Sequence, residues 1–205
     1  MRQGKMTNHK DVEIITKPNA DSIAQSATAA SKKGPPPVHL WNPPFCGDLD
    51  MRIARDGTWF YLGTPIGRKP LVKLFSSIIR KDDDNYFLVT PVEKVGIKVD
   101  DAPFVAVDFE AETVGTHQSL TFTTNVDDKV TAGPNNPIRV IRDPKTGEPS
   151  PYILIRNNLE ALIDRKSFYR LIDLGEYETM NGESWFGLSS SSSFFPIIPS
   201  AELDI

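Results

Sequence analysis

The apolar positions of this chain follow a helical period in two short stretches. In the first stretch, four apolar residues have the i, i+3, i+4, i+7 spacing of one buried helical face: Leu71, Leu74, Phe75 and Ile78. Pro70 suits the first turn of such a helix, because the missing N–H would be unpaired there anyway. In the second stretch, Asp164 can cap a helix with Phe168, Leu171, Ile172 and Gly175 on one face, and Gly175 can end it. The pattern therefore predicts two helices.

Most other apolar segments are short and bounded by turn residues, which is typical of strands. Val105, Val107 and Phe109 alternate as one buried strand face. Asp56-Gly57 lies between two apolar runs and predicts a hairpin with a type I′ turn, whose two central residues need positive φ. Further strands are predicted at residues 86–90, 94–99, 104–110, 119–124, 129–131, 138–142, 152–156, 185–188 and 194–198.

Two stretches 97 residues apart carry the same local pattern. Residues 66–75 align without a gap with residues 163–172, with four identical positions. The Asp56-Gly57 turn corresponds to a longer turn at residues 143–147, and an aromatic pair opens a strand after each helix. A period of this length indicates a duplicated unit rather than a solenoid repeat, with a chance match as the alternative. The predicted fold class is α+β, with two strand-rich units, one helix in each, and mainly antiparallel sheets.

The chain divides into an N-terminal extension and two units. Residues 1–37 carry a net charge of +3 and few large apolar groups, so we expect a mostly disordered basic extension with short helical character around residues 22–30. The first α+β unit is expected at residues 38–112 and the second at residues 113–205. The five serines at residues 189–193 suggest a flexible hairpin tip, with an anion-binding backbone nest as the alternative.

Composition indicates a soluble protein of the cytoplasm. Hydrophobic residues make up 39% of the chain, no apolar run is long enough to span a membrane, and no signal-peptide core is present. The single cysteine, Cys46, excludes an internal disulfide framework. The body after residue 37 carries a net charge of −7, which makes it a poor partner for nucleic acid.

Familiar catalytic and metal-binding patterns are not found in the sequence. The three histidines are scattered singly, without zinc-ligand spacing, and Cys46 has no partner histidine that the sequence can indicate. Neither a Gly-x-Ser-x-Gly elbow nor a phosphate-binding loop occurs. We therefore expect no metal and no cofactor, and an enzymatic role is less favoured than a binding role.

Two pairs of cations are candidates for anion binding. Arg68-Lys69 and Arg165-Lys166 each lie at the start of a predicted helix, where free N–H groups and the dipole favour anions. If the two units pack with approximate two-fold symmetry, these four cations converge on a phosphate-bearing ligand. The alternative is four solvated basic residues beside loops.

Two other short segments are candidates for a binding site. Thr90, Glu93 and Lys94 place polar groups in an interruption between strands, where a β-bulge at proline is the alternative. Arg156 and Asn157, followed by a second asparagine, can read a base or ribose edge, and an ordinary turn is the alternative.

Several segments resemble one bacterial family, called domain of unknown function 1285. They are residues 47–53, 56–61, 64–68, 86–94, 101–104 and 158–163, and the resemblance extends over about residues 38–198. It implies two related domains, with a C-terminal domain loosely like a pleckstrin-homology fold. It also implies a suggested nucleotide-type ligand at the domain interface and a suggested role in signal transduction, without an established biochemical activity.

The chain departs from the family pattern at one position. The family often has a histidine before a proline where this chain has Asn136 before Pro137. Asparagine cannot perform acid–base chemistry, but it can form hydrogen bonds, so a binding role is retained better than a catalytic role.

The main functional hypothesis is a cytoplasmic ligand-binding or regulatory protein that holds a phosphate-bearing molecule between its two units. In this hypothesis Arg68 and Arg165 neutralise phosphate, while Lys94, Arg156 and Asn157 line the cleft. The expected partner is a nucleotide-type small molecule.

Two other hypotheses remain open. A protein–protein adaptor would use exposed strand edges of the second unit and the N-terminal extension. A hydrolase would use carboxylates such as Asp48, Asp50 or Glu93 and is the least favoured.

Overall fold

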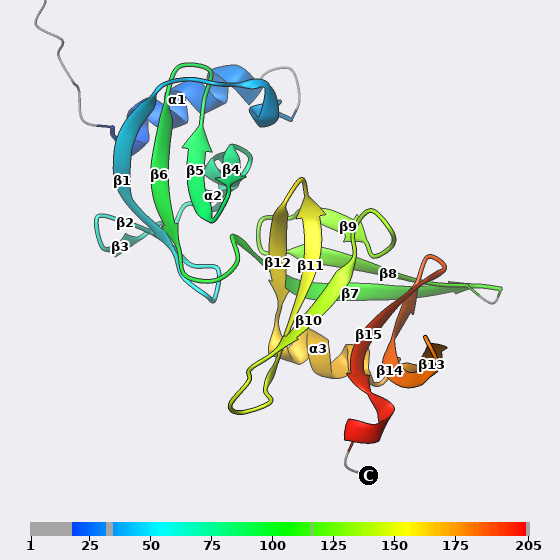
Figure 1. Ribbon diagram of the computed structural model, residues 1–205. Coiled ribbons are helices and arrows are strands. Elements are labelled where there is room, and N and C mark those ends of the chain that lie inside the picture. Colours follow the sequence, from blue (N-terminus) through cyan, green and yellow to red (C-terminus); the bar gives the residue numbers. More distant parts are fainter. Residues whose placement is uncertain (1–17, 32–34, 116, 204–205) are drawn as a thin grey trace, which may run out of the picture.

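The strands form two six-stranded sheets and one three-stranded sheet in the computed structural model, which describes residues 18–31, 35–115 and 117–203 (Figure 1). All strand pairs are antiparallel except one pair in each six-stranded sheet. The described chain is therefore mostly β with some helix.

The first unit consists of two three-stranded meanders joined by a helix. Its elements are β1 (Phe45–Ile53), β2 (Trp59–Tyr61), β3 (Thr64–Pro65), α2 (Lys69–Ser76), β4 (Ile79–Asp82), β5 (Asn85–Val89) and β6 (Lys94–Val99). The strand order is β3-β2-β1-β6-β5-β4, and β1 runs parallel to β6. A short 3-10 helix at Val38–Leu40 precedes this unit.

The second unit contains three meanders. Its elements are β7 (Phe104–Val114), β8 (His117–Thr124), β9 (Lys129–Thr131), β10 (Ile138–Arg142), β11 (Pro149–Arg156), β12 (Leu159–Ile163), α3 (Arg165–Ile172), β13 (Glu176–Met180), β14 (Glu183–Ser190) and β15 (Ser193–Pro199). The six-stranded sheet has the order β10-β11-β12-β7-β8-β9, with β12 parallel to β7, and β13-β14-β15 form the small sheet. A 3-10 helix at Ser200–Glu202 follows.

The topology confirms the duplication predicted from the sequence. Three strands, a helix and three strands occur as β1-β2-β3-α2-β4-β5-β6 and again as β10-β11-β12-α3-β13-β14-β15. In the first copy, the first and last strands in sequence, β1 and β6, pair in the middle of the sheet. Their counterparts β10 and β15 are in contact but belong to different sheets. The meander β7-β8-β9 has no counterpart in the first unit, and its first strand pairs with β12 instead. The predicted boundary between residues 112 and 113 falls within β7.

The two repeat helices begin where the sequence predicts, but α2 ends at Ser76 and α3 at Ile172, before the last position of each predicted face. The predicted positions Leu71, Leu74 and Ile172 are only partly buried. Pro70 lies in the first turn of α2, and the carboxylate of Asp164 accepts the N–H of Ser167 at 2.7 Å to cap α3. The predicted apolar positions Phe168 and Leu171 are buried. None of the helices in the described part of the chain has the length and apolar character needed to cross a membrane.

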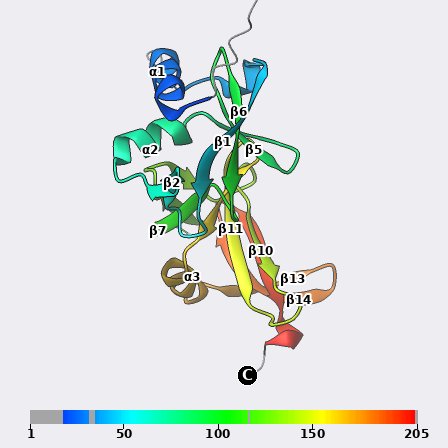
Figure 2. The same ribbon diagram turned by 90° about the vertical axis from the view of Figure 1, so that its left-hand side faces the viewer.

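Helix α1 (Ala20–Ala30) packs against α2 on the first unit (Figure 2). Asn19 caps it by accepting the N–H of Ser22 at 2.9 Å, and Ile23 and Ala27 are fully buried. The predicted helical segment is confirmed, but the mostly disordered extension is wrong for residues 20–30, because these buried side chains dock the segment on the body. Residues 1–17 and 32–34 of the predicted extension lie outside the described residues.

The first hairpin forms with a different turn from the predicted one. Gly57 has a φ of +83°, while Asp56 is not among the residues of positive φ, so the turn is not type I′. The N–H of Gly57 donates to the carbonyl of Ala54 at 2.9 Å, and the N–H of Ala54 donates to the carbonyl of Thr58 at 2.9 Å. This is a three-residue loop with glycine in the left-handed position, the next most common hairpin connection.

The burial pattern of β7 differs from the predicted alternation. Val105 and Phe109 are buried, but Val107 is 41% exposed. The register of β7 against β8 shifts between Ala106 and Asp108. This irregularity adds a residue to one strand, which moves Val107 to the other face.

The serine run turns the β14–β15 hairpin as predicted, but it is anchored. Ser191 and Ser192 have φ values of 49° and 60° and form the tip. Ser190 is fully buried: its hydroxyl accepts the N–H of Leu120 at 2.9 Å and donates to the carbonyl of Ala132 at 2.8 Å. The expectation of a flexible tip is therefore wrong at Ser190, whose side chain joins the small sheet to the large one.

The buried apolar side chains form one continuous cluster through both units. In the first unit Trp59 stacks on Phe75 with ring centroids 6.3 Å apart. In the second unit Phe109 packs against Phe122 at 5.8 Å. The two units therefore share a core and are held in a defined arrangement.

Candidate functional site

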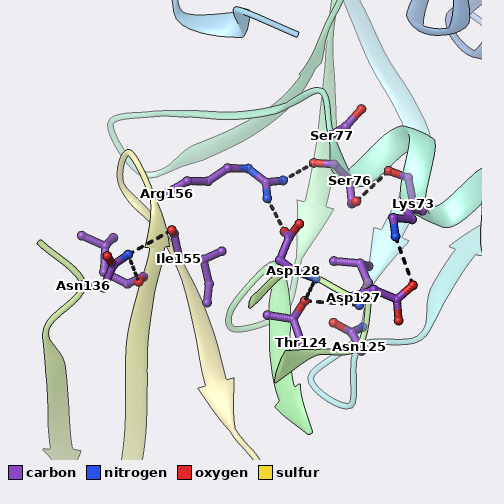
Figure 3. Close-up of polar contacts among 12 residues, drawn as sticks. Lys73, Ser76, Ser77, Thr124, Asn125, Asp127, Asp128, Asn136, Ile155 and Arg156 are labelled. Carbon is purple, nitrogen blue, oxygen red and sulfur yellow. Dashed lines mark hydrogen bonds and ion pairs between the residues drawn. The ribbon is translucent and has the colours of Figure 1, made fainter. Parts of the chain in front are cut away.

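Arg156, the last residue of β11, joins the two units (Figure 3). One of its guanidinium nitrogens donates to the carbonyl of Ser76, the last residue of α2, at 2.7 Å. The other terminal nitrogen pairs with Asp128, and the guanidinium carbon lies 4.7 Å from the ring centroid of Phe104. Arg156 thus holds together the end of α2, the β8–β9 turn and the start of β7.

The β8–β9 turn directs two carboxylates toward the first unit. The hydroxyl of Thr124 accepts the N–H groups of Asp128 at 3.0 Å and Val126 at 3.4 Å. Asp127 has a φ of 64°, a conformation that aspartate tolerates better than most residues. Its carboxylate pairs with Lys73 of α2 at 3.2 Å. Asp127 therefore contacts the first unit directly, whereas Asp128 pairs with Arg156 of its own unit, which in turn bonds to Ser76.

A second contact between the units requires a glycine. Asn125 donates through its amide nitrogen to the carbonyl of Gly57 at 3.2 Å and accepts the N–H of Val105 at 3.1 Å. A Cβ added at Gly57 would lie 2.5 Å from that amide nitrogen. Any side chain at Gly57 would therefore push the first hairpin away from the second unit.

Two cavities lie along this interface and share Lys73. The first has a volume of about 360 Å³ and is lined by residues of both units, including Lys73, Ser76, Ser77, Asp128, Arg156 and Asn157. The second has a volume of about 570 Å³ and includes Asp56, Lys69, Lys73, Thr123 and Asp127. Both volumes are in the range of small-molecule sites.

The charges of the first cavity suit an anionic group. Lys73 and Arg156 contribute two positive charges, and Asp128 contributes one negative charge. One terminal nitrogen of the Arg156 guanidinium donates to the carbonyl of Ser76. This carbonyl lies at the C-terminal end of α2, where the helix dipole favours a cation. An anion entering the cavity would therefore meet Arg156 on the side that Asp128 now occupies.

The first predicted cation pair is divided between two places. Arg68 is the N-cap residue of α2, where its side chain makes no capping bond, and it lines a groove between α1 and α2. Lys69 is exposed and lines the second interface cavity together with Lys73.

The second predicted cation pair lies on α3, away from the first pair. Arg165 donates to the hydroxyl of Tyr169 at 3.1 Å and lines a cavity of about 350 Å³ that also includes Arg55. Lys166 is exposed on the same helix. The cavities that contain Arg68 and Arg165 share no residue, so the structure does not bring the four cations together.

The predicted segment between β5 and β6 forms a turn. The hydroxyl of Thr90 accepts the N–H of Glu93 at 3.2 Å, and the carboxylate of Glu93 accepts the hydroxyl of Ser22 in α1 at 3.1 Å. Lys94 lies 3.5 Å from Asp82. These three predicted residues are engaged in contacts within the first unit and with α1.

Sequence reasoning missed Lys73 and its aspartate partner. The repeat contains a signal that could have identified Lys73, because this residue aligns with another cation, Arg170 of α3. Arg170 also bonds to an aspartate of the second unit, Asp108, at 2.6 Å. A cation at the same position of both copies thus marks a contact surface on each helix.

Asn136, which precedes Pro137, connects two segments of the second unit. Its side-chain amide donates to the carbonyls of Leu154 at 2.8 Å and Ile155 at 3.1 Å (Figure 3). These bonds hold the segment before β10 against β11, which ends at Arg156. Asn136 therefore supports the strand that presents the interface arginine.

Comparisons with known proteins match almost all of the folded chain. Residues 36–102 match the N-terminal domain of a domain of unknown function, DUF1285, and residues 103–197 match the C-terminal domain of the DUF1285 protein of unknown function. The crystal structure of a DUF1285 family protein from Silicibacter pomeroyi DSS-3 superposes on this chain with a TM-score of 0.80. The two sequences are 63% identical, and the match covers 89% of this chain and 98% of the other. A DUF1285 family protein from Shewanella baltica OS155 is 30% identical with a TM-score of 0.48, covering 61% of this chain and 91% of the other. No curated protein matches the sequence.

Proposed function

The chain belongs to the DUF1285 family, and we propose that it is a cytoplasmic regulatory protein that binds a phosphate-bearing, nucleotide-type molecule between its two units. One observation carries the proposal: Lys73 of the first unit and Arg156 of the second line the same cavity of about 360 Å³. A ligand held by both cations would bridge the units, which suits a role in signal transduction.

The chemistry of the lining supports this class of ligand. A guanidinium can bind two phosphate oxygens at once, and an ammonium adds a second positive charge. Asn157, in the same cavity, carries an amide that can donate to and accept from a base or ribose edge. Lys69 in the adjoining cavity offers a further cation to a ligand with more than one phosphate.

Binding at this place has a consequence for the contact between the units. A phosphate that bonds to Arg156 takes the position of the Asp128 carboxylate, and the like charges then repel each other. The β8–β9 turn would lose the ion pair of Asp128 with Arg156. The same turn carries Asp127, the partner of Lys73. The ligand thereby changes the Arg156–Asp128 pair within the second unit and, through the same turn, the Lys73–Asp127 contact between the units.

A protein–protein adaptor is the second candidate, and an exposed edge strand favours it. Four of the five residues of β13 are exposed, and Tyr177 on this strand is 60% exposed. An edge strand with free backbone groups can pair with an extended peptide. We also propose that the second unit, with its two sheets and α3, is loosely pleckstrin-homology-like. A carboxylate-based hydrolase has less support, because Glu93 is engaged by Ser22.

Thermal unfolding against nucleotides, cyclic dinucleotides and inorganic phosphate tests the proposal. A ligand at 100 times its Kd adds about 2.7 kcal/mol to the free energy of unfolding, which raises the melting temperature by several degrees. The Lys73→Ala variant should lose most of the ligand-induced shift, because one cavity cation is missing.

The matched control is Arg170→Ala, which removes the repeat-equivalent cation on α3. It should retain the shift of the wild-type protein. A panel without any stabilising compound would overturn the ligand hypothesis and favour the adaptor. A shift that survives Lys73→Ala would overturn the assignment of the cavity.

A further inference from the structure

The second interface cavity, of about 570 Å³, shares only Lys73 with the cavity proposed for phosphate. It lies between the first hairpin, the N-terminal half of α2 and the β8–β9 turn, so both units contribute to its lining. Its apolar walls consist of Trp59, Ile66 and Val72 from the first unit and of Val107 and Val126 from the second. The cavity can therefore accept the apolar body of a small molecule.

Trp59, which lines this cavity, carries a hydrogen-bond donor without a partner. The residue is 1% exposed, and its indole Nε1 makes no hydrogen bond to any of the residues that the structure describes. A buried tryptophan N–H usually has a partner, because leaving it without one costs the desolvation of the group. An acceptor oxygen on a bound molecule would satisfy this N–H.

The irregularity in β7 supplies an apolar side chain to the same cavity. The register shift between Ala106 and Asp108 leaves Val107 41% exposed, and Val107 lines the cavity from the second unit. Irregularities of this kind are common next to binding sites, where they redirect a side chain. An apolar body in the cavity would cover this valine.

The second copy of the repeat has a smaller cavity at the corresponding place. Three aligned pairs of residues line the two cavities: Ile66 and Ile163, Gly67 and Asp164, and Val72 and Tyr169. The cavity of the second copy has a volume of about 350 Å³, against about 570 Å³ in the first. The larger volume agrees with a valine at the position where the second copy has a tyrosine.

The charge that remains available in the lining is positive. Lys69 is exposed, lines the cavity, and has no ion-pair partner within 4.0 Å in the described part of the chain. The other charged groups are engaged, because Lys73 pairs with Asp127 and the carboxylate of Asp56 accepts the N–H of Thr58 at 2.9 Å. The ammonium of Lys69 therefore favours a ligand with a carboxylate.

We propose that the second interface cavity is a further binding site, for a small aromatic carboxylate that carries a hydroxyl or carbonyl oxygen on its ring. The ring packs against Val72 and Val107, the ring oxygen accepts the N–H of Trp59, and the carboxylate pairs with Lys69. A rigid ring holds the oxygen and the carboxylate apart with less loss of conformational freedom than a flexible chain. This site takes a ligand without phosphate and is independent of the phosphate site.

Two-dimensional NMR of the isotope-labelled full chain tests the proposal, because the indole N–H of each of the three tryptophans gives its own signal. The substitutions Trp41→Phe and Trp185→Phe identify the signal of Trp59. The probes are para-hydroxybenzoate, para-hydroxyphenylacetate and para-acetylbenzoate, and none of them contains phosphate. At least one probe should move the Trp59 N–H proton signal downfield in a saturable titration, as a new hydrogen bond requires. Lys69→Gln should weaken the binding of that probe.

The second copy of the repeat supplies a blocking variant and its matched control. Val72→Tyr introduces the tyrosine of the second copy into the cavity and should weaken probe binding about tenfold or more. Leu71→Phe also introduces the aromatic residue of the second copy, at a position that does not line this cavity, and should retain the wild-type affinity. If Val72→Tyr does not fold, Val107→Phe fills the cavity from the opposite unit.

Three results overturn the proposal. The first is a panel in which no probe binds. The second is binding that leaves the Trp59 N–H signal in place, because the probe then lies elsewhere. The third is equal affinity of the blocking variant and the Leu71→Phe control for the probe.

Discussion

Replacement of Arg156 by alanine is expected to weaken the contact between the two units, through Ser76, and the packing of the second unit, through Asp128 and Phe104. The hydrogen bond from the guanidinium to the Ser76 carbonyl contributes about 1.5–3 kcal/mol, because its donor is charged. The side chains of Arg156 and Asp128 are 31% and 33% exposed, so their ion pair contributes up to about 1 kcal/mol. The contact with the Phe104 ring contributes about 0.5–1 kcal/mol. Because these terms overlap, the expected loss is about 2–4 kcal/mol.

Urea unfolding followed by circular dichroism measures this loss. The slope of the free energy of unfolding against urea concentration scales with the surface that unfolds cooperatively. If Arg156 couples the two units, Arg156→Ala lowers both the free energy of unfolding and this slope, or it divides the transition in two.

Arg139→Ala is the control, because Arg139 makes the same kinds of contact inside one unit. It bonds to Glu160 at 2.5 Å and lies 4.4 Å from the Tyr152 ring centroid. Its loss should lower the free energy of unfolding without a change of slope. The coupling role of Arg156 is refuted if both variants retain the wild-type slope, or if Arg156→Ala loses less than about 0.5 kcal/mol.

Two other predictions concern stability. Ser190→Ala leaves the N–H of Leu120 and the carbonyl of Ala132 without their buried partner and should cost about 2–4 kcal/mol in urea unfolding, whereas Ser189→Ala should cost little. The hydrogen bond from Arg80 lowers the pKa of Asp82 below its ordinary value of 3.8, and Lys94 adds to the effect. The stability that this carboxylate contributes is therefore fully present above about pH 4 and is lost as the pH falls through the lowered native pKa. Melting temperatures between about pH 6 and 2 should show a smaller acid-induced decrease in Asp82→Asn than in the control Asp83→Asn; equal decreases would contradict this assignment.

The elements that could be predicted from sequence are those whose own side chains define them. Residues 94–99, 129–131 and 138–142 were expected as strands and form β6, β9 and β10 with the same bounds. By contrast, β13 has four exposed residues among five and therefore shows no alternation of buried and exposed positions. It lies at the edge of the small sheet and pairs with β14. Strand β12 alternates buried and partly buried positions and pairs with the adjacent β11, so it had a local signal that sequence reasoning missed. Its parallel pairing with the distant β7, in contrast, leaves little local signal.

The candidate site was only half predictable for a similar reason. Arg156 and Asn157 were expected to line a cleft between the units, and both line the cavity of about 360 Å³. Lys73 and Asp128 were missed, because each looks like an ordinary surface residue of a helix or a turn. Their role depends on the packing of the β8–β9 turn against the end of α2, which no local pattern reveals.

The meander β7-β8-β9, which has no counterpart in the first unit, explains why the symmetric arrangement expected from the repeat does not occur. The two equivalent helices do not face each other across a two-fold axis, because each contacts the meander β7-β8-β9 through the same repeat position. Lys73 of α2 bonds to Asp127 in its β8–β9 turn, and Arg170 of α3 bonds to Asp108 on β7. Arg68 and Arg165, at the N-termini of the two helices, therefore line separate cavities. Any change in the β8–β9 turn acts directly on the contact with α2. A ligand that competes with Asp128 for Arg156 would therefore act where the two copies of the repeat are joined.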